Sequence, residues 1–364
     1  MTNKPQFVGE CKRVKLDEIC SKGKSSLRQK DVINDGPYSV YGASGIVGTT
    51  SDYQNEIPYV AVIKDGAGVG RANACEPMTS VLGTMQALIP NSNVERDYLL
   101  HLVRSLRLGE GFSGSTIPHI YFKDYGRLEV PLPPLEAQKQ IVSQLGLVEA
   151  QIEQAEAQIE QLDHLVKSRF VEMFGDLASY ESRALKDCVL VIESGKSPKC
   201  LARPREGDSL GVLKLSAISS GVYKETENKA LPSDTKAADG KVVCDGDILL
   251  ARKNTPELVG QSVLVNHTDG NIMFPDIVFR MHVRPEVDEV YLSHALAYPL
   301  AGAIKSLAHG SAKSMSNIPK SELAKLLIPL PPLALQQEFA AFVAQADKSR
   351  FAWRVHMQLR VLVL

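Results

Sequence analysis

The segment Pro131-Leu132-Pro133-Pro134-Leu135 occurs a second time in the chain, as Pro329-Leu330-Pro331-Pro332-Leu333. The two copies lie 198 residues apart, and a glutamine follows each at the same distance, Gln138 in the first and Gln336 in the second. A repeat with so long a period indicates two structural units of similar build.

Further matched residues precede each copy in the same order. They are Leu16 with Leu185, Gly23-Lys24-Ser25 with Gly195-Lys196-Ser197, Gly114-Ser115 with Gly310-Ser311, and Ile120 with Ile318. Chance recurrence could explain one short motif, but not an ordered set. The sequence therefore predicts a duplicated domain, each copy followed by a proline-rich stop and a helix.

The residues after the first proline segment follow a heptad pattern that is typical of a coiled coil. Its apolar positions are Ile141, Leu145, Val148, Ile152, Ala155, Ile159, Leu162 and Val166. Good helix formers fill the positions between them. The pattern predicts a helix from Glu136 to Phe174, about 60 Å long at 1.5 Å per residue, that Gly175 ends.

We call the line of apolar heptad positions along each helix its seam. The seam of the second copy is less regular, because Arg350 and Arg360 interrupt its apolar positions. Its apolar members are Phe339, Val343, Ala346, Trp353, Met357 and Leu364. One helix cannot bury such a seam alone, so we expect the two helices to pair within the chain, antiparallel if the units are related by a pseudo-two-fold axis.

The segments outside the helices indicate mixed structure. Residues 59–63 and 247–251 are predicted strands, and residues 98–108 and 290–307 are predicted helices. The expected fold class is α+β. Its expected parts are a first domain at 1–130, a first helical segment at 131–175, a second domain at 176–328 and a short second helical segment at 329–364.

Composition places the chain among globular proteins. It has 364 residues, 44% of them hydrophobic and 23% charged, with a mean hydropathy of -0.09. Since neither a bilayer-spanning segment nor a signal peptide is evident, we expect a cytoplasmic protein that does not bind membranes. The six cysteines lack the spacing of a zinc site, so no metal is expected.

Charge is nearly balanced, with a net value of -1, so a phosphate-binding surface has to be a local patch. Two segments without acids provide such patches, residues 21–30 and 194–205. Their cations are Lys22, Lys24, Arg28 and Lys30 in the first, and Lys196, Lys199, Arg203 and Arg205 in the second.

Some segments partly match two nucleotide-binding motifs, and every match is incomplete. A phosphate loop needs a further glycine five residues before the Gly-Lys-Ser glycine, and these positions hold Glu18 and Leu190. The glycine-rich residues 66–71 lack the final glycine of a dinucleotide-binding motif, so a tight turn is expected there. No catalytic residue is therefore predicted.

Three features of the sequence occur together. They are the duplicated domain, the proline segments with their glutamines, and a helix whose last turns contain Lys167-Ser168-Arg169-Phe170 before Phe174-Gly175. In this combination the chain resembles the specificity subunit of Type I restriction-modification systems. The stretch from Tyr38 to Ala43 is similar to the first target-recognition domain of many members. The resemblance implies two target-recognition domains of mixed α/β structure, separated by a long antiparallel two-helix coiled coil. Each domain would read one half of an asymmetric, bipartite DNA site.

The resemblance also implies the partners: double-stranded DNA, two modification (methyltransferase) subunits and restriction subunits. No cofactor is expected in this chain, because S-adenosylmethionine, ATP and Mg would belong to those subunits. Besides the two cationic segments, weaker candidates for base contact are Arg71, His119, Arg252, Lys253, Asn254, Lys313 and Asn317.

Two other interpretations remain open at this point. The chain could be a duplicated coiled-coil scaffold that binds only protein, which its near-neutral charge favours and its matched cationic segments oppose. It could also serve a methylation-only or fused nuclease system, which would differ only in its partners.

Overall fold

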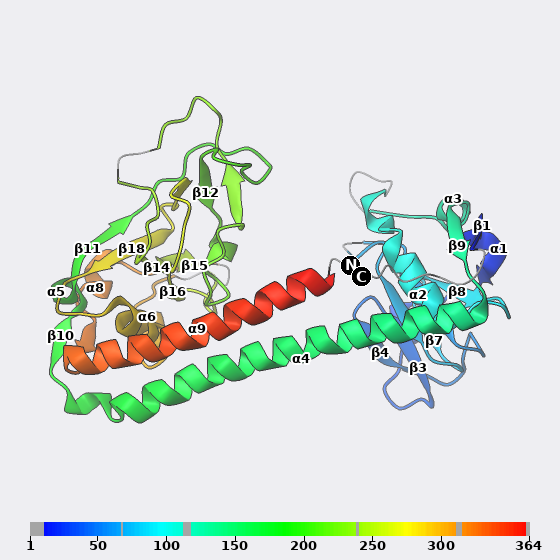
Figure 1. Cartoon of the computed structure of the whole chain (residues 1–364), viewed down its shortest axis with the longest axis horizontal. Coiled ribbons are helices and arrows are strands. Elements are labelled where there is room, and N and C mark those ends of the chain that lie inside the picture. Colours follow the sequence, from blue (N-terminus) through cyan, green and yellow to red (C-terminus); the bar gives the residue numbers. More distant parts are fainter. Residues whose placement is uncertain (1–10, 67, 112–117, 238–239, 311–314, 362–364) are drawn as a thin grey trace, which may run out of the picture. The chain divides into compact units, whose positions relative to one another are not determined.

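The computed structural model describes residues 11–66, 68–111, 118–237, 240–310 and 315–361, with side chains up to Trp353. The chain divides into two compact units, of which the first reaches Glu153 and the second covers Gln154–Leu359. Figure 1 shows their helices and strands. Among the helices of the described ranges, none combines the length and the apolar character that crossing a membrane requires.

The main sheet of the first unit is antiparallel, with the strand order β2-β8-β5-β6. Its strands are Cys20–Lys22 (β2), Met85–Pro90 (β8), Tyr59–Ile63 (β5) and Ala72–Cys75 (β6). β5, predicted as a strand, is buried on both faces. Val60 and Val62 pack with helix α2 (Arg96–Ser105) in one core, while Tyr59, Ala61 and Ile63 belong to a second, as the alternation of side chains along a strand requires.

Two smaller sheets complete this unit, with the orders β4-β3-β7 and β1-β9. The first contains one parallel pair, β3 with β7, and the second joins the start of the domain to its end. Their strands are Gly45–Thr50 (β4), Tyr38–Gly42 (β3), Ser80–Val81 (β7), Lys12–Lys15 (β1) and Glu129–Leu132 (β9), and two short helices are Leu16–Ile19 (α1) and Phe122–Tyr125 (α3).

The second unit repeats this plan strand by strand, with sheets β11-β18-β14-β16, β13-β12-β17 and β10-β20. The pair β12–β17 is parallel, like β3–β7. The strands are Val189–Ser194 (β11), Val278–Val283 (β18), Ile248–Ala251 (β14), Ser262–Leu264 (β16), Asn228–Ala230 (β13), Gly211–Leu213 (β12), Ile272–Met273 (β17), Ser182–Ala184 (β10) and Leu327–Pro329 (β20). An additional sheet pairs Lys253–Asn254 (β15) with Ser316–Asn317 (β19).

Matched backbone hydrogen bonds confirm that the sequence repeat is a structural repeat. The amide of Leu16, in α1, donates to the carbonyl of Leu128 at 3.0 Å. The amide of Leu185, at the start of helix α5 (Leu185–Cys188), donates to the carbonyl of Leu326 at 2.8 Å. Helix α8 (Lys320–Leu323) takes the place that α3 has in the first unit.

The helix predicted at 290–307 is broken into α6 (Glu289–Ala297) and α7 (Ala301–Ser306), so that prediction was wrong in its continuity. Pro299 lies between them. A proline lacks the amide that a helix interior requires and disfavours helical angles in the residue before it. Tyr298 accordingly has φ -117° and ψ -81°.

The glutamines after the proline segments are buried and bind partners at equivalent positions in the two units. The side-chain amide of Gln138 donates to the carbonyl of Pro133 at 2.9 Å, and its oxygen accepts from the amide of Glu95, at the start of α2. Gln336 donates to Pro331 at 2.7 Å and accepts from the amide of Asp288, at the start of α6. Each glutamine therefore fixes the proline segment to the helix of its own domain.

The two long helices are Leu135–Phe174 (α4) and Leu333–Val361 (α9). Gly175, with φ +53°, ends α4 as expected, and its amide donates to the carbonyl of Val171. The second half of α4 and α9 lie side by side and run antiparallel (Figure 1), since Phe170 packs on Phe339 while Asp163 pairs with Arg350.

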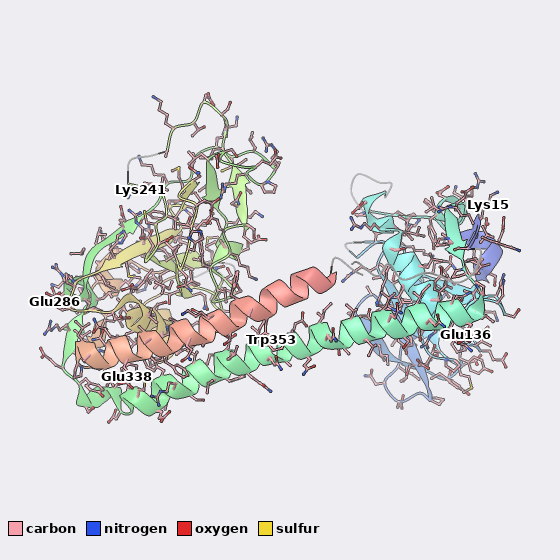
Figure 2. The ribbon with its side chains drawn as sticks, viewed as in Figure 1. Lys15, Glu136, Lys241, Glu286, Glu338 and Trp353 are labelled. Atoms are coloured by element: carbon pink, nitrogen blue, oxygen red, sulfur yellow. The ribbon has the colours of Figure 1, made fainter. Side chains whose placement is uncertain are left out.

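The seam residues differ in burial. Ala155 and Val166 are fully buried, and Val166 belongs to a core with Phe170, Phe339 and Val343. Ile141 packs on the core of the first unit. The half-buried seam positions are Ile141, Leu145, Val148, Ile152, Ile159, Leu162 and Trp353. Met357 lies beyond the described side chains. Figure 2 labels Glu338, in the first turns of α9, and Trp353 further along it.

Candidate nucleic-acid interface

We call the folded residues before α4 the first head (11–134) and those before α9 the second head (176–332). In the first head, β2 and β5 are both antiparallel to β8, so both end at the same edge of the sheet. In the second head, β11 and β14 end together in the same way. We call this the loop edge of each head. Arg252, just after β14, shows the convergence, because its Nη1 lies 3.3 Å from the Oγ of Ser194, the last residue of β11.

The two Gly-Lys-Ser segments lie at the loop edge. Their glycines are required there because neighbouring atoms leave no room for a Cβ. A Cβ on Gly23 would lie 2.5 Å from the side-chain oxygen of Asn55, and one on Gly195 would lie within 2 Å of the carbonyl oxygen of Phe274. The following lysines, Lys24 and Lys196, are exposed. The turns thus present a lysine at equivalent places in the two heads, without the glycine-rich loop of a nucleotide-binding site.

The cations of the first segment remain accessible. Lys22, Lys24, Arg28 and Lys30 are all exposed. The Nζ of Lys22 lies 5.6 Å from the ring centroid of Phe122, a distance that permits a cation–π contact. The arrangement leaves these charges free to approach a polyanion.

In the second segment, some cations are accessible to solvent and one is buried in ion pairs. Lys196 and Lys199 are exposed, and Arg203 is exposed although it pairs with Glu206 at 3.1 Å. The side chain of Arg205 is only 9% exposed, and its Nη2 contacts Asp269 and lies 2.6 Å from Glu225. Arg205 therefore serves the fold of the second head, because two carboxylates from distant segments already neutralise it.

The weaker candidates also separate on burial. Arg71 is exposed, and Arg252 stacks on Phe279 with its Cζ 5.2 Å from the ring centroid. Asn254 is buried, and its side-chain oxygen accepts from the amide of Thr255, so a contact with a base is not open to it in this arrangement. Lys313 lies outside the described residues.

Two candidates face residues on a neighbouring segment of the loop edge. The Nδ1 of His119 contacts the carboxylate of Asp65, and the His119 ring lies 4.0 Å from that of Tyr121. Lys253 stands opposite Asn317 in the β15–β19 pair. Asp65 was not among the predicted residues, and only a comparison of the charges at matched repeat positions could have indicated it.

A buried charged network supports the sheet of the second head and was also missed by sequence reasoning. The guanidinium of Arg280 contacts Glu193, lies 4.8 Å from the Phe274 ring and donates to the carbonyl of Val242 at 2.7 Å. Lys241 contacts the same carboxylate. Burial would raise the pKa of Glu193, but the hydrogen bonds from Lys241 and Arg280 outweigh it, and the pKa is lowered. The network therefore stabilises the pairing of β11 with β18, because Glu193 lies on β11 and Arg280 on β18.

Comparison with known proteins finds similarity over the first part of the chain. Residues 9–164 match the model of the Type I restriction modification DNA specificity domain. The Type I restriction enzyme EcoEI specificity subunit of Escherichia coli is 34% identical over 148 residues, which are 40% of this chain and 25% of that subunit. Over this part, the chain is therefore similar to Type I restriction-modification specificity subunits.

Two further specificity subunits extend the comparison. The EcoKI specificity subunit of Escherichia coli strain K12 is 20% identical over 71% of this chain and 60% of that subunit. The matches thus span less than two thirds of the length of these curated relatives. The crystal structure of a Type I restriction-modification S subunit from M. genitalium shares the fold, with a TM-score of 0.52 at 15% identity, covering 99% of this chain and 95% of that one.

Proposed function

We propose that this chain is the DNA sequence-specificity component of a Type I restriction-modification system, in which each head reads one half of an asymmetric, bipartite site in double-stranded DNA. The observation that carries the proposal is the duplicated loop edge. Both heads present exposed cations, Lys22 and Lys24 in one and Lys196 and Lys199 in the other, where the strands of the main sheet end. Two heads of the same build but different sequence suit two different half-sites.

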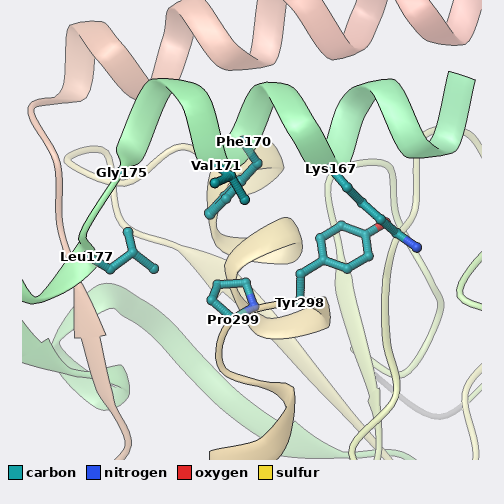
Figure 3. Close-up of a pocket in the computed structure, with 7 residues that line it drawn as sticks. All are labelled: Lys167, Phe170, Val171, Gly175, Leu177, Tyr298 and Pro299. Carbon is teal, nitrogen blue, oxygen red and sulfur yellow. The ribbon is translucent and has the colours of Figure 1, made fainter.

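Catalysis would belong to partner subunits: two methyltransferase subunits using S-adenosylmethionine, and restriction subunits using ATP and Mg. Apolar side chains on α4 support a protein partner on this helix, because Leu147, Leu165 and Val171 are between 50% and 68% exposed. Beside Val171, the last turns of α4 and the connection between α6 and α7 line an open pocket of about 200 Å³ (Figure 3). Phe170, Leu177 and Pro299 line it.

Salt-dependent DNA binding, measured for the chain alone and with methyltransferase subunits added, tests this function. The near-neutral charge of the chain leaves few cations for phosphate neutralisation, so we expect weak binding alone and tight, sequence-specific binding in the complex. Nanomolar specific binding by the chain alone would contradict this division of roles. A complex that binds no DNA would instead favour the protein-binding scaffold.

A further inference from the structure

The residues that follow β5 and β14 occupy equivalent places in the two heads. The carbonyl of the last residue of each strand accepts from a glycine at the end of the following loop, Gly70 to Ile63 at 2.8 Å and Gly260 to Ala251 at 2.9 Å. Both glycines have positive φ, +83° and +80°. The two loops differ in length, but each is closed by an equivalent hydrogen bond to the end of its strand.

The next residue extends the match to the opposing segment. The amide of Ile120 donates to the carbonyl of Lys64 at 3.0 Å, and the amide of Ile318 donates to that of Arg252 at 2.9 Å. One residue further on, Asp65 bridges to His119 and Lys253 pairs with Asn317. Asp65 and Lys253 are thus equivalent positions, and so are His119 and Asn317.

The charge at this equivalent position is reversed between the heads. Asp65 places a carboxylate at a loop edge whose other exposed charges include Lys22, Lys24 and Arg71, and its side chain is 30% exposed. Lys253 places a donor at the same point of the second head. A carboxylate is repelled by phosphate, so at a DNA surface it is stabilised where it accepts a hydrogen bond from a base amino group.

We infer that positions 65 and 253 help determine specificity, and that they give the heads opposite base preferences. The inference rests on the proposed function. Asp65, held by His119, accepts from the exocyclic amino group of cytosine or adenine in one half-site. Lys253 donates to guanine in the other, where O6 and N7 are the matching acceptors. The backbone at this position is thus the same in both heads, while the side chain offers a hydrogen-bond acceptor in the first head and a donor in the second.

The test is selection of sequences from a random duplex DNA library by the complex of the whole chain with its methyltransferase subunits. The variants are Asp65→Asn and Asp65→Ser in the first head, and Lys253→Gln and Lys253→Met in the second. Each should relax or change one base position in one half-site, with discrimination there falling about tenfold or more, and leave the other half-site as in the wild type.

Matched controls are Asp17→Asn in α1 and Lys186→Gln in α5, exposed residues that precede β2 and β11 and so lie at the other end of each sheet. They should leave the selected motif unchanged. Thermal unfolding identifies a damaged head, and having two substitutions at each position keeps the test decisive if one of them fails to fold.

An unchanged motif with folded variants at both positions would overturn the inference. So would a uniform loss of affinity by the Lys253 variants with a smaller salt dependence, since that result marks a phosphate contact. Failure of the wild-type complex to select any bipartite motif would instead reject the proposed function, which distinguishes the two outcomes.

Discussion

The Nη2 of Arg350 on α9 lies 2.7 Å from the Oδ1 of Asp163 on α4. Arg350 interrupts the apolar positions of the second helix, and the structure explains its presence there, because Asp163 and Asp347 both contact its guanidinium. Its side chain is only 14% exposed. The polar pair thus lies beside the apolar core of Phe170, Phe339 and Val343 and helps fix the register of the two helices.

Replacing Asp163 with Ala should destabilise the second unit by about 2 kcal/mol, since a largely buried guanidinium loses one of its two carboxylates. The double variant Asp163→Leu with Arg350→Leu should recover much of that loss, because an apolar pair suits the seam. Urea unfolding followed by fluorescence of Trp353, the single tryptophan, measures both. Equal destabilisation by the single and the double change would mean that the pair does not act as a unit.

The buried glutamines should be essential to the junctions that they fix. Gln336→Ala should cost about 2 kcal/mol of unfolding free energy, because the amide of Asp288 and the carbonyl of Pro331 lose their partner. Gln337→Ala, at the exposed neighbouring position, is the matched control and should be close to neutral. Similar effects of the two changes in urea unfolding would refute the structural role of Gln336.

Acid should weaken the second unit through His294. Burial lowers the pKa of this imidazole, which packs on Phe339, while nearby Asp347 and Arg350 act on it in opposite directions. The unfolded chain therefore takes up the proton first as the pH falls below about 6.5, and stability should fall between pH 7 and 5. His294→Leu should flatten this slope, whereas the exposed His164→Leu should not. An unaltered slope in the His294 variant would contradict the account.

The cationic segments should supply phosphate contacts. Changing Lys22, Lys24 and Arg28 together to Ala should weaken DNA binding by the complex across all sequences and lower the salt slope, by about 0.9 for each lost contact. The control changes Lys12, Arg13 and Lys15 in β1, which removes the same charge away from the loop edge. If both triple variants bind DNA equally well in a salt titration, the loop edge is not the binding surface.

Comparison of the sequence with itself was sufficient to predict the repeat. Local pattern was sufficient for the ends of α4 and for the strands β5 and β14, because hydrophobic periodicity and the prolines and glycines that end an element lie within a few neighbouring residues. It was not sufficient for contacts between distant segments. Arg205 lies in a stretch without acids, yet Glu225 and Asp269 reach it from 20 and 64 residues away. The pairing of Asp65 with His119 spans 54 residues and depends on the completed sheet.

Exchange of one head tests most directly the claim that the heads read DNA independently. Because β1 pairs with β9 up to Leu132 and α4 begins at Leu135, the exchange should replace residues 11–134 with the matching head of a related specificity subunit, so that no strand is divided. Methylation sites mapped in cells carrying the hybrid and its methyltransferase subunits should show one new half-site and one unchanged half-site. A hybrid that is active but alters both half-sites, or neither, would contradict the account.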